Sequence, residues 1–138
     1  MVPDTLRQVV LQRARGCCEY CRMNQAIQGV TFHIEHVIPL ARGGATIAEN
    51  LALACPSCNL WKSDLVEAED PSTGWRVPLY DPRRERWGDH FRVDGTLIVG
   101  TSPTGRATVA RLRMNAERRL QIREVERSLE WWPPQPEG

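Results

Sequence analysis

The sequence predicts an α+β fold centred on a strand–strand–helix unit. Residues 30–37 form a β-branched and aromatic run, and residues 51–54 form a shorter apolar run; both are typical of strands. Pro56 suits the first turn of a helix that reaches about residue 64, because its missing N–H would have no partner there. One CxxC pair precedes the first strand and another opens the helix. These observations favour a small core stabilised by a metal.

Two further parts flank this core. A helix is predicted over residues 4–15, with Asp4 as its N-cap. The core is expected over residues 16–63, and residues 64–138 form a C-terminal extension. A chain of this length is the size of one domain, so we expect a single domain over residues 1–138.

The C-terminal extension is predicted to contain a β-hairpin and two helices. The hairpin turn is placed at Asp94-Gly95, a pair that tolerates positive φ. The first helix should follow a cap at residues 102–104 and end near Asn115, and the second should cover residues 116–132. We expect the second helix to bury an apolar face made of Leu120, Ile122 and Leu129.

Charge and hydropathy argue against a strongly charged binding partner and against a membrane or secreted protein. The chain has 18 basic and 17 acidic residues, a net charge of +1, so its bulk charge favours no acidic or basic partner. No apolar run approaches the roughly 20 residues of a membrane span or resembles a secretory signal, so we expect a soluble, cytoplasmic chain with no membrane partner. The extension is rich in both arginine and acids, which we expect to form solvated surface pairs.

The five cysteines give the sharpest signal. Cys18 with Cys21 and Cys55 with Cys58 form two CxxC pairs, which can supply four thiolates at the corners of a tetrahedron around Zn²⁺. Disulfides are the alternative, but a cytoplasmic chain keeps its thiols reduced. Cys17 could replace Cys18 in a CxxxC spacing; we favour Cys18 because its spacing matches that of the second pair. A structural zinc ion can contribute on the order of 10 kcal/mol to a small fold.

Polar side chains interrupt the first predicted strand. The stretch "HIEHVIP" at residues 33–39 places His33, Glu35 and His36 in a β-branched run. A second CxxC at the start of the following helix would bring this strand beside Asn59. A carboxylate and a carboxamide oxygen suit a hard cation such as Mg²⁺. A histidine, with an ordinary pKa near about 6.5, can deprotonate water beside that cation.

These motifs resemble the HNH nucleases of the His-Asn-Asn type, which have the ββα-metal (His-Me finger) fold. The resemblance is carried in order by "CEYC", "HIEHVIP", "GG" and "ENLALACPSCNLWK" and covers the predicted core. It implies that His36 is the general base and that Asn50 orients the His36 ring. It also implies that Glu35 and Asn59 hold the catalytic divalent ion. Glutamate stands where the family usually has aspartate, and an asparagine at position 59 favours Mg²⁺ over softer ions.

The activity that this resemblance implies is metal-dependent endonucleolytic hydrolysis of DNA phosphodiester bonds. We expect structural Zn²⁺ and catalytic Mg²⁺, with Mn²⁺ or Ni²⁺ as possible substitutes. Lys62 and Arg42 are candidate contacts to backbone phosphates, and solvated surface residues are the alternative. His33 is either a third metal ligand or a histidine that braces Glu35 or the zinc loop.

A second class of function fits the same pattern. A zinc-stabilised ββα fold could bind nucleic acid or a protein partner without cutting it, and neither the zinc nor the fold separates the two. His36 and Glu35 separate them, because a binding module does not need a general base or an acidic metal ligand. The sequence does not reveal the DNA preference of the protein. It also does not indicate whether the protein nicks one strand or cuts both, or what its oligomeric state is.

Overall fold

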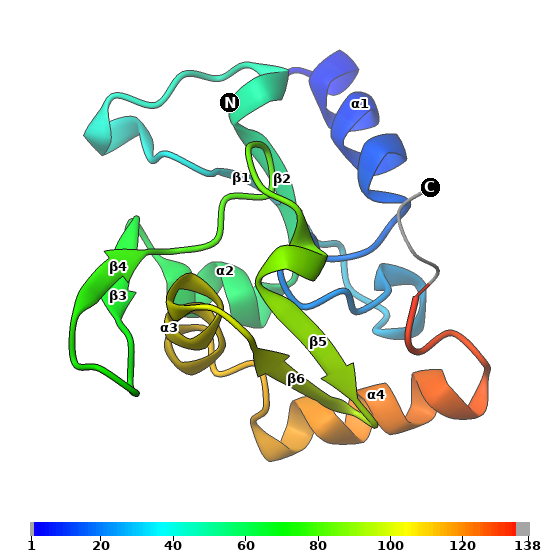
Figure 1. Cartoon of the computed structure of the whole chain (residues 1–138). Coiled ribbons are helices and arrows are strands. Elements are labelled where there is room, and N and C mark those ends of the chain that lie inside the picture. Colours follow the sequence, from blue (N-terminus) through cyan, green and yellow to red (C-terminus); the bar gives the residue numbers. More distant parts are fainter. Residues whose placement is uncertain (1, 135–138) are drawn as a thin grey trace.

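The fold is α+β, as predicted, and residues 2–134 are described by a computed structural model. Figure 1 shows α1 beside the β1–β2 pair at one end of the molecule and α4 across the opposite end. The strands of this part of the chain form three separate antiparallel pairs, β1–β2, β3–β4 and β5–β6. The elements in chain order are α1 (Asp4–Ala14), β1 (His33–His36), β2 (Leu51–Ala54), α2 (Pro56–Lys62), β3 (Glu67–Glu69), β4 (Arg76–Pro78), β5 (Phe91–Asp94), β6 (Leu97–Gly100), α3 (Pro103–Arg111) and α4 (Glu117–Ser128).

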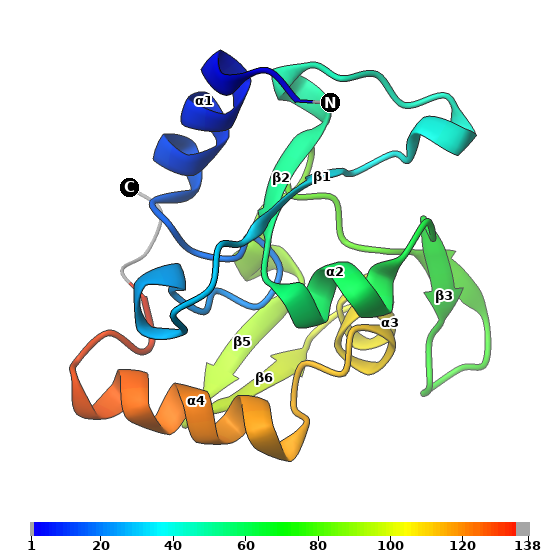
Figure 2. The same cartoon turned by 180° about the vertical axis from the view of Figure 1, so that it is seen from behind.

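The predicted strand–strand–helix unit is present. β1 pairs with β2 in a register that places His36 opposite Leu51. All four residues of β2 are buried, as its continuous apolar sequence predicts. Cys55 caps the N-terminus of α2 and Pro56 occupies the first turn, so the helix begins directly after β2. Figure 2 shows α2 below the β1–β2 pair and beside α3.

Several boundaries differ from the prediction. β1 is shorter than residues 30–37, because only residues 33–36 pair with β2. The N-cap of α1 is Pro3, so the prediction of Asp4 as N-cap is wrong by one residue; Asp4 lies in the first turn, where its charge still favours the positive end of the helix dipole. The prediction from the sequence also did not include β3, which pairs with β4.

The C-terminal hairpin and helices form with shifted ends. Asp94 pairs with Leu97, so the two-residue loop is Gly95-Thr96 and lies one residue later than predicted. Gly95 has φ 62, which a glycine adopts without steric cost. Ser102 caps α3 through its hydroxyl, which accepts from the backbone N–H of Gly105 at 2.9 Å. α4 ends at Ser128, before the predicted limit near residue 132.

The core and the extension share one hydrophobic cluster. It contains residues from α1, β2 and the hairpin together with residues that follow α3 and α4, such as Val10, Leu53, Phe91, Leu112 and Trp132. The extension therefore packs against the ββα unit and shares its hydrophobic core. None of the helices within residues 2–134 is both long and apolar enough to cross a membrane.

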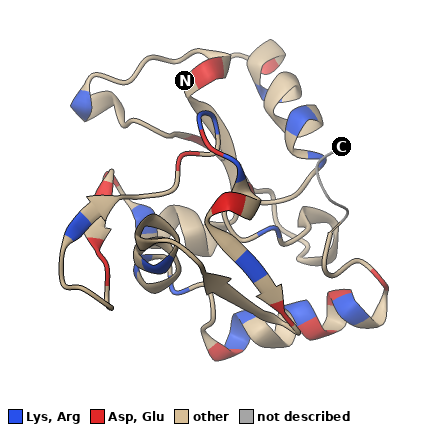
Figure 3. Ribbon diagram, viewed as in Figure 1, with Lys and Arg blue, Asp and Glu red and all other residues tan. Residues whose placement is uncertain are grey.

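α4 departs most from the expected pattern. Leu129, predicted in its apolar face, is 51% exposed, and Leu120 and Ile122 are only partly buried. Arg119, Arg123, Glu126 form its buried face instead. The expectation that the arginines of the extension are solvated is therefore wrong for Arg119 and Arg123. Figure 3 shows positive and negative residues alternating along this helix.

Candidate active site and metal centre

The four predicted zinc ligands meet in one buried cluster. The sulfur atoms of Cys18, Cys21, Cys55 and Cys58 all lie within 4.8 Å of one another. No disulfide joins these cysteines. Four soft ligands at this separation fit the tetrahedral coordination of Zn²⁺. Cys17 lies outside the cluster, where its backbone forms an isolated bridge with Asn24, so Cys18 and not Cys17 completes the group of four sulfur atoms.

Both CxxC pairs have the same local geometry. The backbone N–H of Cys21 donates to Cys18 Sγ at 3.5 Å, and the backbone N–H of Cys58 donates to Cys55 Sγ at 3.4 Å. The chain thus turns tightly enough at each pair to point two sulfur atoms at one centre. Because the second pair is the first turn of α2, the cluster fixes the position of this helix under the β1–β2 pair.

A guanidinium from the extension contacts the cluster. Arg119 Nη2 donates to Cys58 Sγ at 2.9 Å and approaches Cys55 Sγ at 3.6 Å. Burial lowers the pKa of this guanidinium, and the nearby thiolates more than offset that effect, so its pKa lies above the ordinary value. Sequence reasoning missed Arg119. The signal was the spacing of Arg119, Arg123 and Glu126, which places three charges on one helix face.

Glu35 lies in a buried polar pocket. Its carboxylate accepts a hydrogen bond from the Tyr20 hydroxyl and lies 3.5 Å from Lys62 Nζ. Burial raises the pKa of Glu35, and Lys62 and Tyr20 counteract only part of that effect. Tyr20, the aromatic residue of "CEYC", was not predicted as a site residue. Its position between two zinc ligands was the available signal.

Lys62 does not fit the role of a phosphate contact in this structure. It is 1% exposed, pairs with Glu35, and donates to the backbone oxygen of Val37 at 3.0 Å. Its position in the last turn of α2 points the ammonium group inward against β1. We therefore correct the prediction for Lys62: it is a buried counter-ion of Glu35.

His36 faces the other side of β1. Successive side chains of a strand point to opposite faces, so Glu35 points toward α2 and His36 points away from it. His36 Nε2 lies 2.8 Å from Thr46 Oγ1, which comes from the loop that links β1 to β2. Thr46 is therefore the side chain that contacts the His36 ring, and sequence reasoning did not identify it.

Asn50 holds the loop from which Thr46 reaches His36. Its side-chain oxygen accepts from the backbone N–H of Ile38 at 2.9 Å, and its amide donates to the oxygens of Ile38 and Ala45 at 3.0 and 2.9 Å. Gly44 completes the arrangement, because a Cβ there would overlap the Ile38 oxygen. All of these Asn50 bonds go to backbone atoms, and one of them goes to Ala45, the residue before Thr46.

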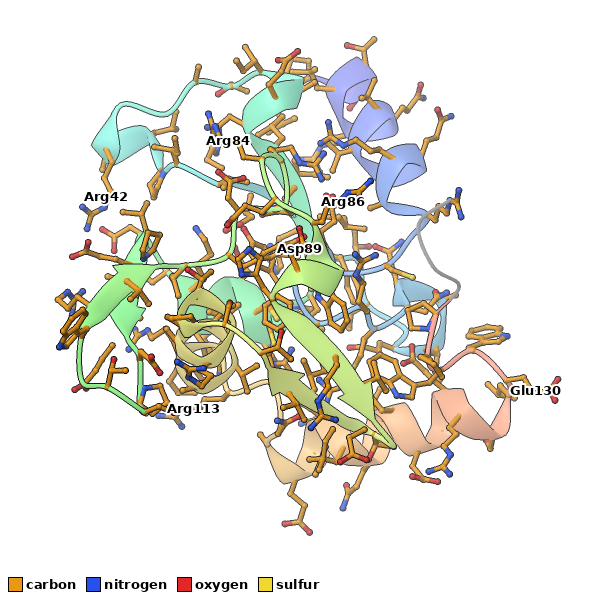
Figure 4. The ribbon with its side chains drawn as sticks, viewed as in Figure 1. Arg42, Arg84, Arg86, Asp89, Arg113 and Glu130 are labelled. Carbon is orange, nitrogen blue, oxygen red and sulfur yellow. The ribbon has the colours of Figure 1, made fainter. Side chains whose placement is uncertain are left out.

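The remaining predicted residues lie around this centre. Asn59 is half-buried on α2, one turn before Lys62. His33 is exposed at the first position of β1. Arg42 is exposed in the loop that links β1 to β2, and its Nε donates to the Asp64 oxygen at 2.8 Å. Figure 4 shows Arg42 projecting from the outer part of this loop.

Comparisons with known proteins agree with this arrangement. Residues 18–65 match the HNH endonuclease family. Over 54 residues, the chain is 35% identical to the type IV methyl-directed restriction enzyme EcoKMcrA of Escherichia coli (strain K12). The match covers 36% of this chain and 20% of that enzyme, so the chain spans only about a fifth of its relative. No solved structure matches the chain.

Proposed function

We propose that residues 18–65, which match the HNH endonuclease family, form the catalytic part of a metal-dependent endonuclease that hydrolyses DNA phosphodiester bonds. In this proposal His36 is the general base, and Glu35 and Asn59 hold a divalent ion, with Mg²⁺ as the expected metal. The name of the relative describes methyl-directed restriction. Because the match covers a fifth of that enzyme, we carry over DNA cleavage and not its methyl specificity.

The position of His36 is the observation that supports this activity best. The ring is half-buried, and its Nε2 meets the Thr46 hydroxyl at 2.8 Å. When Nε2 carries the proton and donates to Thr46, Nδ1 keeps its lone pair and can accept a proton from water. Asn50 and Gly44 fix the loop that carries Thr46, so the ring is held in one orientation before the substrate arrives.

The donor set at Glu35 and Asn59 fits a hard divalent ion. Both side chains offer oxygen, and the Glu35 pocket already accommodates the positive charge of Lys62. A divalent ion bound there would stabilise the negative charge that develops on the phosphate and on the leaving oxygen. In this proposal Lys62 and Tyr20 orient the carboxylate, and His36, the next residue of β1, takes the proton from the attacking water.

The alternative is a zinc-stabilised module that binds nucleic acid or protein without cutting it. One observation favours it: both oxygens of Glu35 have partners, one in Tyr20 and the other in Lys62, and its side chain is only 5% exposed. A divalent ion would have to share this carboxylate with the ammonium group. The two functions predict different results in a cleavage assay.

The test is nicking of supercoiled plasmid across Mg²⁺, Mn²⁺, Ni²⁺ and Zn²⁺. Wild type should nick in the presence of Mg²⁺, and His36→Ala should lose at least about 10²-fold in rate, the lower end of what a general base contributes. Zinc content and circular dichroism should stay unchanged in His36→Ala. Arg118→Ala, at an exposed position of α4, is the matched control. Wild type that never nicks, together with a His36 variant that binds DNA equally well, would establish the binding module instead.

A further inference from the structure

α4 buries a charged face. Arg119, Arg123 and Glu126 are 4%, 0% and 1% exposed, whereas Val125 on the same helix and Leu129 directly after it are about half exposed. The three charged residues are spaced by four and three positions, so they share one side of the helix. Arginine and glutamate are almost never fully buried unless they are paired. The surface that α4 covers must therefore supply their partners.

Arg119 joins three elements with one guanidinium group. Its Nη2 donates to Cys58 Sγ at 2.9 Å and approaches Cys55 Sγ at 3.6 Å. Its Nη1 donates to the backbone oxygens of Leu112 and Arg113, at 2.6 and 3.3 Å, just past the C-terminus of α3. The side chain thus connects α4 to the second CxxC pair and to the end of α3.

The other two charges attach α4 to neighbouring segments. Arg123 donates to the backbone oxygens of Met114 and Thr96, at 2.6 and 3.0 Å. Glu126 accepts from the backbone N–H of Asn24 at 2.6 Å, three residues after the first CxxC pair. The face of α4 therefore touches the chain next to both CxxC pairs, and Arg119 alone reaches the sulfur atoms.

The sign of the charge explains why this face is buried. Four thiolates around Zn²⁺ carry a net charge of −2, and charged donors form the stronger hydrogen bonds to such ligands. Four protonated thiols carry no charge and would leave the Arg119 guanidinium poorly compensated. A zinc-loaded cluster therefore favours burial of Arg119, and an empty cluster opposes it.

We propose that Arg119 is a positioning residue of the zinc centre and that it couples zinc binding to the docking of α4 on the core. The inference rests on the proposed zinc site and not on DNA cleavage. Coupling is reciprocal, so the factor by which Arg119 raises zinc affinity is the factor by which zinc stabilises the docked helix. Loss of zinc releases α4 from the ββα unit.

The first test is competition for zinc against a chromogenic chelator. Arg119→Met keeps an unbranched apolar side chain like the stem of arginine and removes the guanidinium with its charge and donors. It should weaken zinc binding by about 10- to 100-fold, as loss of a partner of a metal ligand does. Arg119→Lys keeps the charge and should fall between Arg119→Met and wild type. Arg118→Met, at the exposed neighbouring position, should match wild type. Equal zinc affinity in all four proteins would overturn the proposal.

The second test separates this role from simple packing. With Co²⁺ in place of zinc, the sulfur-to-metal absorption band should move to longer wavelength in Arg119→Lys and Arg119→Met, because both variants remove the guanidinium Nη2 that contacts Cys58 and Cys55. Arg118→Met should leave the band in place. In the zinc-loaded Arg119 variants, amide hydrogen exchange in residues 117–128 should accelerate by the same factor as the loss in zinc affinity, while α1 stays protected.

Two results would contradict the proposal in different ways. An unshifted Co²⁺ band in Arg119→Lys would show that the guanidinium does not act on the sulfur atoms, even if Arg119→Met fails to fold. A wild-type protein that binds neither Zn²⁺ nor Co²⁺ would refute both the zinc site and the coupling. Plasmid nicking is measured separately, so failure of the nuclease proposal remains distinguishable from either result.

Discussion

Lys62 Nζ lies 3.5 Å from Glu35 Oε2, with the two side chains only 2% and 5% exposed. The pair joins the last turn of α2 to β1, and the Tyr20 hydroxyl binds the same carboxylate from the first CxxC pair. Because a buried charge without a partner is strongly unfavourable, each member of this pair depends on the other. The candidate metal ligand Glu35 is thus part of the core as well as of the site.

Lys62→Met should destabilise the protein by about 3 kcal/mol or more, because it leaves the Glu35 carboxylate buried without its counter-ion. The double variant Lys62→Met with Glu35→Gln should recover most of that loss, since no buried charge remains. Urea unfolding of both variants and of Glu35→Gln, without added Mg²⁺, measures the coupling between the residues. Additive effects of the two substitutions would show that the pair contributes nothing to stability.

Thr46→Val should reduce the rate of plasmid nicking by about tenfold, a part of the roughly 10²- to 10⁴-fold that a general base contributes. Valine has the shape of threonine but cannot accept the hydrogen bond from His36 Nε2, so the ring loses its fixed orientation. The free energy of unfolding should change little, because Thr46 is only half-buried. Thr31→Val, in the exposed segment before β1, is the matched control, and an unchanged rate in Thr46→Val would mean that Thr46 does not orient the base.

Asp70 gives a pH dependence of stability outside the candidate site. Hydrogen bonds from Arg106, at 3.0 Å from Nε and 2.8 Å from Nη2, together with those from Ser72 and Thr73, lower the pKa of Asp70 from 3.8 to about 2. A folded-state pKa below the unfolded value means that this carboxylate stabilises the fold above about pH 4 and that the effect disappears as pH falls toward 2. Asp70→Asn should therefore be less stable than wild type at pH 6.

The measurement is urea unfolding of wild type and Asp70→Asn between pH 3 and pH 7. The difference in free energy of unfolding should be constant from pH 5 upward and should narrow below pH 4. Asp94→Asn, at the exposed end of β5, controls for the general loss of an acidic residue. A difference that does not vary with pH would show that ionisation of Asp70 is not linked to folding.

Local sequence signals predicted the ββα unit well, because each of its elements is specified by its own residues. The apolar run of β2, Pro56 at the start of α2 and the two CxxC spacings all act over a few positions. The same signals failed for α4. Helical periodicity assumes that apolar side chains are buried, whereas α4 packs on four cysteine sulfur atoms, whose negative charge favours Arg119 when they hold zinc. Only the tertiary position of the cysteines reveals that preference.

In the candidate site, too, local sequence identified some residues and only the three-dimensional fold revealed their partners. Glu35 and His36 were identified from one short motif, but their partners Tyr20 and Thr46 come from segments 15 and 10 positions away. Lys62 was predicted to be a phosphate contact, with a solvated surface residue as the alternative, because the sequence around it does not show that β1 covers it. Its burial follows from the packing of α2 under β1, which no local pattern encodes.

Burial of Lys62 leaves Arg42 as the remaining candidate for a phosphate contact. Arg42 is exposed, and only its Nε is engaged, by the backbone oxygen of Asp64 at 2.8 Å. Arg42→Ala should weaken DNA binding about uniformly across sequences and reduce the salt dependence, the slope of log K against log salt, by about one. Arg127→Ala, which removes an exposed arginine from α4, should leave the slope unchanged. Lys62→Met should also leave it unchanged, because a buried ammonium releases no counterion from DNA; a slope that falls with Lys62→Met and not with Arg42→Ala would restore Lys62 as the phosphate contact.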